Sequence, residues 1–297
     1  MEEVGGNPLV SIIIPVYNGA NYLEKAIDSA LSQQYSNFEV IVVNDGSNDG
    51  NLTSSISKKY GSKIRYFEKK NGGVSSALNL GISVMKGKYF SWLSHDDIYL
   101  PNKLSKQVSF AEKFNSLFLY SDYTFIDNNG KFLDILNDVN KDLMDDIRLR
   151  LIQFYPIHGC SALINRQIFD QIGGFNENLE TTQDYDMWFR ISLFFKIDFL
   201  NEIVLFSRLH AEQDSNIKPH RFLEGDVLYS EMLRKMILLN QYSEFDFYRS
   251  FKSLLLRNFY SSAAMAFRGI NSFHFKIKAG LYVFYFLLKL ISNKFLK

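Results

Sequence analysis

Residues 10–18 read Val-Ser-Ile-Ile-Ile-Pro-Val-Tyr-Asn, a β-branched run that meets a proline and then polar side chains. Such a run is typical of a parallel strand that is buried on both faces of its sheet. Three similar apolar runs follow along the chain, at 38–43, 64–67 and 88–93. The segments between them carry apolar residues at helical spacing. Strands that alternate with helices in short units predict an α/β fold, with a mostly parallel sheet and helices on both faces.

After Pro101 the alternation becomes less regular. We expect helices at 103–114 and 182–195, strands at 117–126 and 161–164, and a hairpin turn at Asn128-Asn129-Gly130. From about Leu223 the pattern is mostly helical. The sequence therefore predicts an α/β domain over 1–215 and a helical appendage over 216–297.

The appendage differs from the rest of the chain in charge. The whole chain has 297 residues and a net charge of +1, but 221–297 holds twelve Lys and Arg against five Asp and Glu. Basic residues among Phe, Tyr and Leu favour an anionic partner, either a membrane or a nucleic acid. No Arg-rich groove motif supports nucleic acid. We expect contact with the inner face of a membrane; the alternative is packing on the first domain or on a second copy in a homodimer.

Targeting signals and disulfides are not predicted. The N-terminus lacks the charged and apolar regions of a signal peptide, and the longest apolar run, Ala279–Ile291, is shorter than the ~18 residues of a membrane span. Cys160 is the single cysteine, so no internal disulfide forms. His158 lies nearby, but one Cys and one His cannot build a zinc site, and we interpret Cys160 as a packed thiol. These features predict a cytoplasmic protein, peripheral on the membrane.

Polar residues gather where the predicted strands end. They form four clusters, at 15–18, 44–47, 71–73 and 95–97. In an open α/β sheet ligands bind beyond the carboxyl ends of the strands. No Gly-x-Gly-x-x-Gly follows the first strand and no P-loop motif occurs, which disfavours a dinucleotide oxidoreductase and a P-loop NTPase. The clusters predict a site for a polar, phosphorylated ligand.

Two adjacent carboxylates, Asp96 and Asp97, occupy the last of these clusters. Like charges at such short range repel unless a cation or hydrogen-bond donors offset them. A divalent metal shared with phosphate oxygens would do so, while a turn that ends the strand is the other interpretation.

The chain resembles a known family, the inverting family 2 glycosyltransferases with a Rossmann-like GT-A fold. The resemblance covers roughly residues 8–215. Its motifs are Val10–Asn18, Leu31–Gln34, Val42–Asp49, Asn71–Ser75, Asp96-Asp97, Gly173-Gly174-Phe175, Gln183–Trp188 and Arg208-Leu209-His210.

The resemblance implies roles for the nucleotide-sugar-binding residues. Asp45 would accept the uracil N3–H, Pro15 and Tyr17 would line the base pocket, and Gly73 would lie in the donor-binding loop. Asp96 would bind the ribose, while Asp97 and His210 would hold a divalent metal, Mn²⁺ or Mg²⁺, at the diphosphate. Leu78 stands where many relatives carry Arg, so a phosphate contact from that position is missing.

On the acceptor side the resemblance makes Asp184 the general base, with Asp186 as a competitor two residues later. Gln183 replaces the acidic residue that commonly precedes this base. Gln183 and Trp188 would contact the acceptor, although the spacing of Trp188 suits core packing equally.

The resemblance thus implies a metal-dependent transfer of a sugar from a UDP-sugar to a hydroxyl of a glycan or lipid-linked acceptor. The process would be bacterial surface-polysaccharide assembly, such as O-antigen or capsule formation. A dTDP-sugar donor, or a non-catalytic sugar-nucleotide-binding protein in such a complex, are the alternatives.

Overall fold

The computed structural model describes residues 7–133, 146–152, 157–211, 213, 221–240, 242–257, 259–272 and 275–283. The chain divides into two compact units, one built from 1–138 and 157–217, the other from 139–156 and 218–297. The described residues 146–152 fall in the second unit, and the domain bounds of 1–215 and 216–297 stay a prediction.

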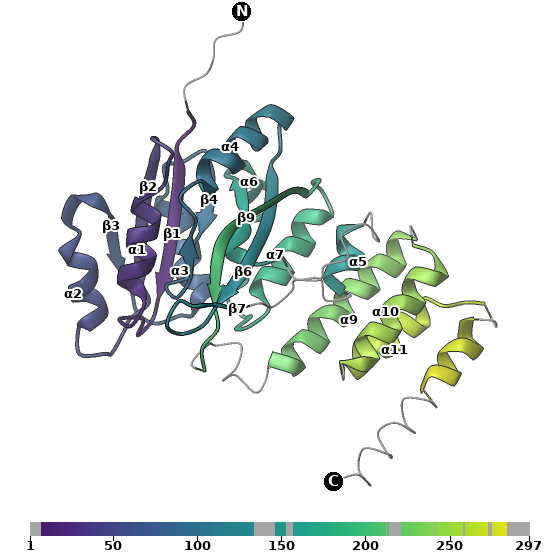
Figure 1. Ribbon diagram of the computed structural model, residues 1–297. Helices are drawn as coiled ribbons and strands as arrows, with labels where there is room; N and C mark the ends of the chain where they lie inside the picture. The colour runs from purple at the N-terminus through teal and green to yellow at the C-terminus, as the bar shows by residue number, and fades with distance from the viewer. Residues whose placement is uncertain are drawn as a thin grey trace, which may run out of the picture. The chain divides into compact units, whose positions relative to one another are not determined.

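The first unit contains a single sheet with the strand order β3-β2-β1-β4-β8-β6-β9-β5, and β7 pairs with β6. The first four strands in this order are parallel: β3 (Arg65–Glu68), β2 (Phe38–Asn44), β1 (Val10–Val16) and β4 (Tyr89–Trp92). All residues of β1 are buried, and helices α1 (Leu23–Leu31) and α3 (Val74–Val84) both pack against it. The β-branched run therefore forms the central strand that the sequence predicted (Figure 1).

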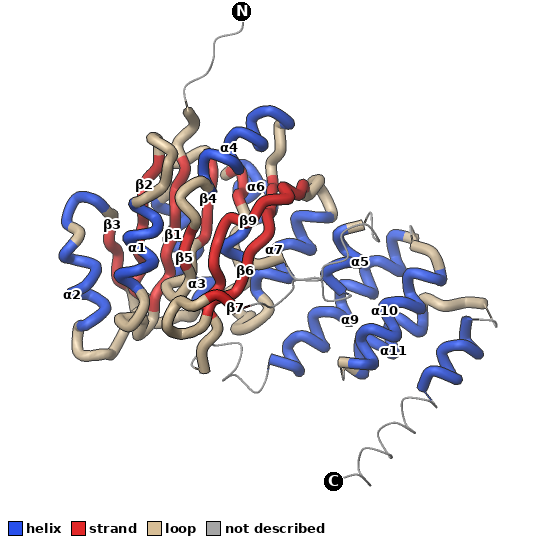
Figure 2. Tube along the Cα trace, in the orientation of Figure 1, coloured by secondary structure: helices blue, strands red, loops and turns tan. Residues whose placement is uncertain are grey.

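The second half of the sheet mixes directions. Strand β8 (Leu163–Asn165) runs antiparallel to β4 and to β6 (Phe118–Ile126), while β9 (Asp198–Arg208) runs parallel to β6. Strand β7 (Phe132–Leu133) pairs with β6 across the predicted hairpin turn. The two-residue β5 (Ile98–Tyr99) pairs with β9 and also contacts α1. The sheet thus curls, so that its last strand, β5, contacts the same helix, α1, that packs on the central strand β1 (Figure 2).

The remaining elements of this unit are helices and 3₁₀ turns. They are α2 (Leu52–Lys59), η1 (Gly61–Lys63), α4 (Lys103–Phe114), the 3₁₀ turn η2 (Gly159–Ser161), α6 (Gln167–Ile172) and α7 (Gln183–Ser192). The expected strand at 161–164 is in fact this 3₁₀ turn followed by β8.

The second unit is helical, as expected. It contains α5 (Ile147–Ile152), α9 (Arg221–Leu239), α10 (Glu244–Leu256) and α11 (Tyr260–Arg268), and residues 275–283 are also helical. Ser243 and Asp246 cap α10 reciprocally. Of the apolar run Ala279–Ile291, residues 284–291 lie outside the described residues. Among the helices that the structure describes, none is both long enough and apolar enough to cross a bilayer.

Candidate functional site

The Ser94–Asp97 loop leaves β4 and enters β5 through a turn in which the Asp97 N–H donates to the Ser94 carbonyl at 3.2 Å. The turn interpretation therefore holds, and it directs the two carboxylates to different partners. Asp96 Oδ2 lies 2.9 Å from His210 Nε2. Asp97 Oδ1 accepts the backbone N–H of Arg208 at 3.0 Å.

The Asp96–His210 pair sits at the end of β9 with little solvent contact, since the two side chains are 13% and 9% exposed. Burial raises the pKa of Asp96, but the hydrogen bond with His210 and the charge of His95 outweigh it and hold that pKa below its ordinary value. The Tyr22 ring lies 5.1 Å from the His210 ring. Asp96 is therefore an ionised carboxylate in contact with an imidazole.

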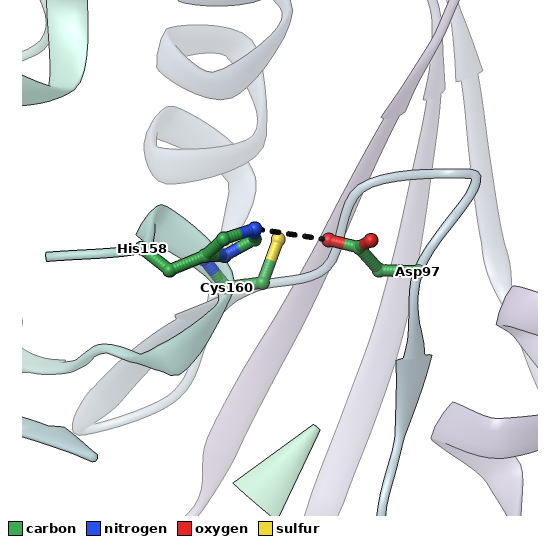
Figure 3. Close-up of side chains that lie close together, drawn as sticks. All are labelled: Asp97, His158 and Cys160. Carbon is green, nitrogen blue, oxygen red and sulfur yellow. Dashed lines mark hydrogen bonds and ion pairs between the residues drawn. The ribbon is translucent and has the colours of Figure 1, made fainter. Parts of the chain in front are cut away.

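Asp97 is in a different environment. It is 3% exposed, and burial together with the Asp96 charge raises its pKa to about 8. Its Oδ2 lies 3.6 Å from His158 Nε2. Burial lowers the pKa of His158 to about 4 and raises that of the Cys160 thiol well above its ordinary value, so both are neutral at pH 7. Figure 3 shows Cys160, on η2, and His158, which caps the N-terminus of η2, both facing Asp97.

Arg208 holds the Ser94–Asp97 loop in place through hydrogen bonds, a role that we did not predict. It is fully buried, and its Nε donates to the Asp96 carbonyl at 2.9 Å. Its Nη1 donates to the carbonyls of Asp127 and Asn128 at 3.0 and 3.2 Å. Its guanidinium lies 4.6 Å from the Tyr22 ring centre. Arg208 thus joins the carboxylate loop to the β6–β7 turn.

The second cluster is organised around Asp45, which is 3% exposed. Its Oδ1 accepts from Lys69 Nζ at 2.7 Å and from the Gly72 N–H at 3.0 Å, and its Oδ2 accepts from the Gly73 N–H at 2.7 Å. The preceding residue, Asn44, closes the turn after β2, since its Oδ1 accepts the Ser47 N–H at 3.0 Å. Asp45 therefore orders the loop that leads into α3.

The first cluster joins the second at the same edge of the sheet. The Asn18 N–H donates to Ser47 Oγ at 2.9 Å, and the Asn18 amide exchanges two 2.8 Å hydrogen bonds with Asn48. Pro15 is buried in β1, whereas the Tyr17 ring is 45% exposed. Of this pair, Tyr17 is the one with an open face.

Helix α7 carries the acceptor-side candidates. Asp186 forms an ion pair with Arg190 at 2.8 Å, and Arg190 also donates to the carbonyls of Ile172 and Gly174. Asp184 lies in the first turn, half-buried, and its Oδ1 accepts the Tyr185 N–H at 2.9 Å. Asp186 is thus held in a structural ion pair with Arg190.

The structure corrects the acceptor contact that we expected from Trp188 on α7. Trp188 is fully buried, donates to the Ile157 carbonyl at 3.2 Å and packs 4.7 Å from the Phe118 ring. It cannot stack on a sugar, so that expectation is wrong. Gln183 is 8% exposed, and its Oε1 has no hydrogen-bond partner among the described residues.

Two neighbouring donor groups could hold a metal. Asp96 Oδ2 and His210 Nε2 are 2.9 Å apart, a separation that two ligands of one ion can have, and the carboxylate is a ligand that Mn²⁺ prefers. Asp97, His158 and Cys160 offer donor atoms that all lie within 4.8 Å of one another, but they include a soft thiol. The first pair therefore fits the expected hard cation.

Comparison with known proteins gives consistent matches. The family described as "Glycosyl transferase family 2" matches residues 11–173. An uncharacterized glycosyltransferase of Rickettsia bellii is 50% identical over 233 residues, which are 77% of this chain and 34% of that protein. The chain thus spans about a third of the length of that relative.

Solved structures resemble the chain in fold. Staphylococcus aureus TarS 1–349 in complex with UDP-GlcNAc superposes with a TM-score of 0.66 at 20% identity, covering 92% of this chain and 80% of that one. The mannosyltransferase PcManGT of Pyrobaculum calidifontis, in complex with GDP-Man and Mn²⁺, superposes with a TM-score of 0.59 at 16% identity, covering 96% and 81%. These likenesses confirm the GT-A type of fold.

Proposed function

Because this chain belongs to glycosyltransferase family 2, we propose that it transfers a sugar from a UDP-sugar to an acceptor hydroxyl with inversion at the anomeric carbon. The observation that carries the proposal is the 2.9 Å contact between Asp96, in the loop after β4, and His210, just after β9. That loop follows a central parallel strand, where α/β sheets bind their ligands. The family membership itself agrees with the enzyme class predicted from the sequence.

Asp45 is the residue proposed to recognise the base. A carboxylate has about four lone-pair sites. Lys69, Gly72 and Gly73 already donate to it, and the Gly72 N–H donates to both oxygens, so the N3–H of uracil would replace the longer Gly72 contact at 3.2 Å. The exposed ring of Tyr17 would cover the base. Thymine carries the same N3–H, so a dTDP-sugar is the second candidate donor; the UDP-GlcNAc bound to TarS favours UDP.

The metal ligands that we propose differ from the pair expected from the sequence, Asp97 and His210. We propose that Asp96 and His210 hold the cation, because their donor atoms already face each other, and that Asp97 positions the loop from inside. The Mn²⁺ in the PcManGT complex supports a cation in this fold. When bound, such an ion offsets the charge that develops on the leaving diphosphate. Arg208 would keep the Asp96 backbone in place while this charge develops.

Asp184 is proposed to remove the proton from the attacking hydroxyl. Inversion by single displacement needs a base on the acceptor side, and general-base catalysis contributes roughly 10²–10⁴-fold. Asp186 is already paired with Arg190, which makes it a matched control. The acceptor is proposed to be a glycan or a lipid-linked glycan.

The helical unit is proposed to contact the inner face of a membrane. Phe245 and Tyr260 are 52% and 54% exposed, and basic side chains lie beside aromatic rings, with Arg249 over Phe245 and Lys252 over Tyr248. Basic residues near an anionic surface contribute about 1 kcal/mol each. Co-sedimentation with vesicles that contain phosphatidylserine should exceed that with neutral vesicles; equal recovery would count against this contact.

The donor is identified by incubating the full chain with UDP- and dTDP-sugars and Mn²⁺, and by measuring release of the nucleoside diphosphate. We expect release from one UDP-sugar that depends on Mn²⁺. The anomeric configuration of the sugar product, read by NMR, should be opposite to that of the donor. A product with retained configuration, or no release from any donor, would contradict the proposal.

A further inference from the structure

A group of three side chains beside the Asp96–His210 pair has the composition of a metal site. The donor atoms of Asp97, His158 and Cys160 all lie within 4.8 Å of one another and converge on one point (Figure 3). We propose that these residues form a second cation site, selective for a thiophilic divalent metal such as Zn²⁺. His158 and Cys160 alone are too few to form such a site, and the β4–β5 loop supplies the third ligand.

The donor set determines which metal would bind. A thiolate is a soft ligand that favours Zn²⁺ or Cd²⁺, whereas Mg²⁺ and Mn²⁺ prefer carboxylates and carbonyls. Zinc takes sulfur, nitrogen and oxygen ligands together at about 2.0–2.3 Å. The fourth position would go to water, as in other three-ligand zinc sites. The two adjacent sites would therefore select different cations.

Hydrogen bonds around the group already orient its members. Cys160 Sγ accepts the Ser94 N–H at 3.1 Å, a contact that also stabilises a thiolate. Asp97 Oδ1 is held by the Arg208 N–H, so that its Oδ2 faces His158. Ser207 Oγ lies 3.1 Å from His158 Nε2 and would be displaced when that nitrogen binds the metal. The contacts to Cys160 and Asp97 are outer contacts of the kind that fix metal ligands and raise affinity.

Binding would require three proton movements. The Cys160 thiol and the Asp97 carboxyl each lose a proton to solvent as their bonds to the metal form. His158 Nδ1 now accepts the Cys160 N–H at 3.2 Å, so coordination through Nε2 moves the ring proton to Nδ1 and sacrifices that contact. Access is on the His158 side, because its side chain is 24% exposed while Asp97 is 4% exposed. The lost contact is minor compared with a metal–thiolate bond.

A metal bound at this second cation site would affect the loop that carries Asp96. A metal held by η2 and Asp97 ties the Ser94–Asp97 loop to the turn beneath it. Zn²⁺ should then inhibit transfer, a consequence that rests on the proposed function. The binding itself does not depend on turnover, so the two can fail separately.

The test is a titration of the full chain with Cd²⁺, monitored by the ultraviolet charge-transfer band of a cadmium–thiolate bond. Cys160 is the single cysteine, so the band reports on this site alone. We expect saturable binding at one equivalent, no band in Cys160→Ser, and binding weaker by at least about 10–100-fold in His158→Gln, because losing a ligand should cost no less than losing an outer-shell partner. Asp96→Asn, which changes the neighbouring pair but removes none of the three proposed ligands, should keep the band.

Equal cadmium affinity in wild type and His158→Gln would overturn the proposal, as would a band of the same strength in urea-unfolded chain. Absence of a band in the folded wild type would also overturn it. If Cys160→Ser does not fold, the comparison of wild type with His158→Gln decides the question. Inhibition by Zn²⁺ is measured separately, so an inactive preparation leaves the spectroscopic result intact.

Discussion

Lys103 provides a test of how the core beneath the site is built. It is fully buried on α4, and its Nζ donates to Gln107 Oε1 at 2.5 Å and lies 3.4 Å from the Ala162 carbonyl. Gln107 in turn donates to the Ser161 carbonyl at 2.7 Å. These two side chains therefore hold the end of η2, the turn that carries Cys160.

Burial lowers the pKa of Lys103 from 10.5 to about 7. Between these values the unfolded chain binds a proton that the folded protein does not. The free energy of unfolding therefore falls as the pH drops from 10.5 to about 7, and below pH 7 this contribution is constant. The gap corresponds to ~5 kcal/mol in total, or about 1.4 kcal/mol per pH unit. The side chain is wholly buried, so solvent does not screen this effect.

Lys103→Met removes the titrating group at similar volume. The variant leaves Gln107 Oε1 without its donor, a cost that does not vary with pH. The difference in unfolding free energy between variant and wild type should therefore shift in favour of the variant by ~2 kcal/mol between pH 9.5 and pH 8. Urea unfolding at the two pH values measures it. Lys113→Met, at an exposed position of the same helix, is the control and should show no such shift. A pH-independent difference for Lys103→Met would refute the reasoning.

Three further outcomes follow from the site. Asp96→Asn and His210→Gln should each raise the Mn²⁺ concentration for half-maximal activity at least tenfold. The double variant should raise it no further than the more damaging single variant, because both residues hold the same ion. Fully additive effects would show that the two residues act independently. Lys69→Met leaves the buried Asp45 carboxylate without its cation, and thermal unfolding should show a loss of roughly 3–5 kcal/mol with a raised donor KM. Trp188→Phe should cost about 1–3 kcal/mol of stability while acceptor KM stays unchanged, whereas a raised acceptor KM would return Trp188 to the acceptor site.

The sequence predicted the parallel half of the sheet because its signal is local. Strand β1 is β-branched and ends at polar residues, and the 44–47 and 95–97 clusters follow strands that we expected. Strand β9 was missed, since Asn201 and Glu202 interrupt its apolar pattern and its stability comes from pairing with β6. A strand of only two residues, β5, carries too little pattern to predict at all.

The sequence predicted which residues form the site better than it predicted how they are arranged. Motifs named Asp96, Asp97 and His210, but adjacent residues leave a turn in different directions, and only the turn geometry pairs Asp96 with His210. Asp97 meets Cys160 only because β4 and β8 pair antiparallel, which brings η2 beneath the loop. On a helix, spacing alone could not tell which face Trp188 occupies. Long-range pairing decided each of these points.

The central claim is that Asp184 acts as the base in an inverting transfer from a UDP-sugar. The most direct measurement is kcat for UDP release with acceptor and Mn²⁺ in wild type, Asp184→Asn and Asp186→Asn. We predict that Asp184→Asn lowers kcat by roughly 10²–10⁴-fold with little change in donor KM. Asp186→Asn, which breaks only the ion pair with Arg190, should keep kcat within about tenfold of wild type. Wild-type turnover by Asp184→Asn would contradict the account.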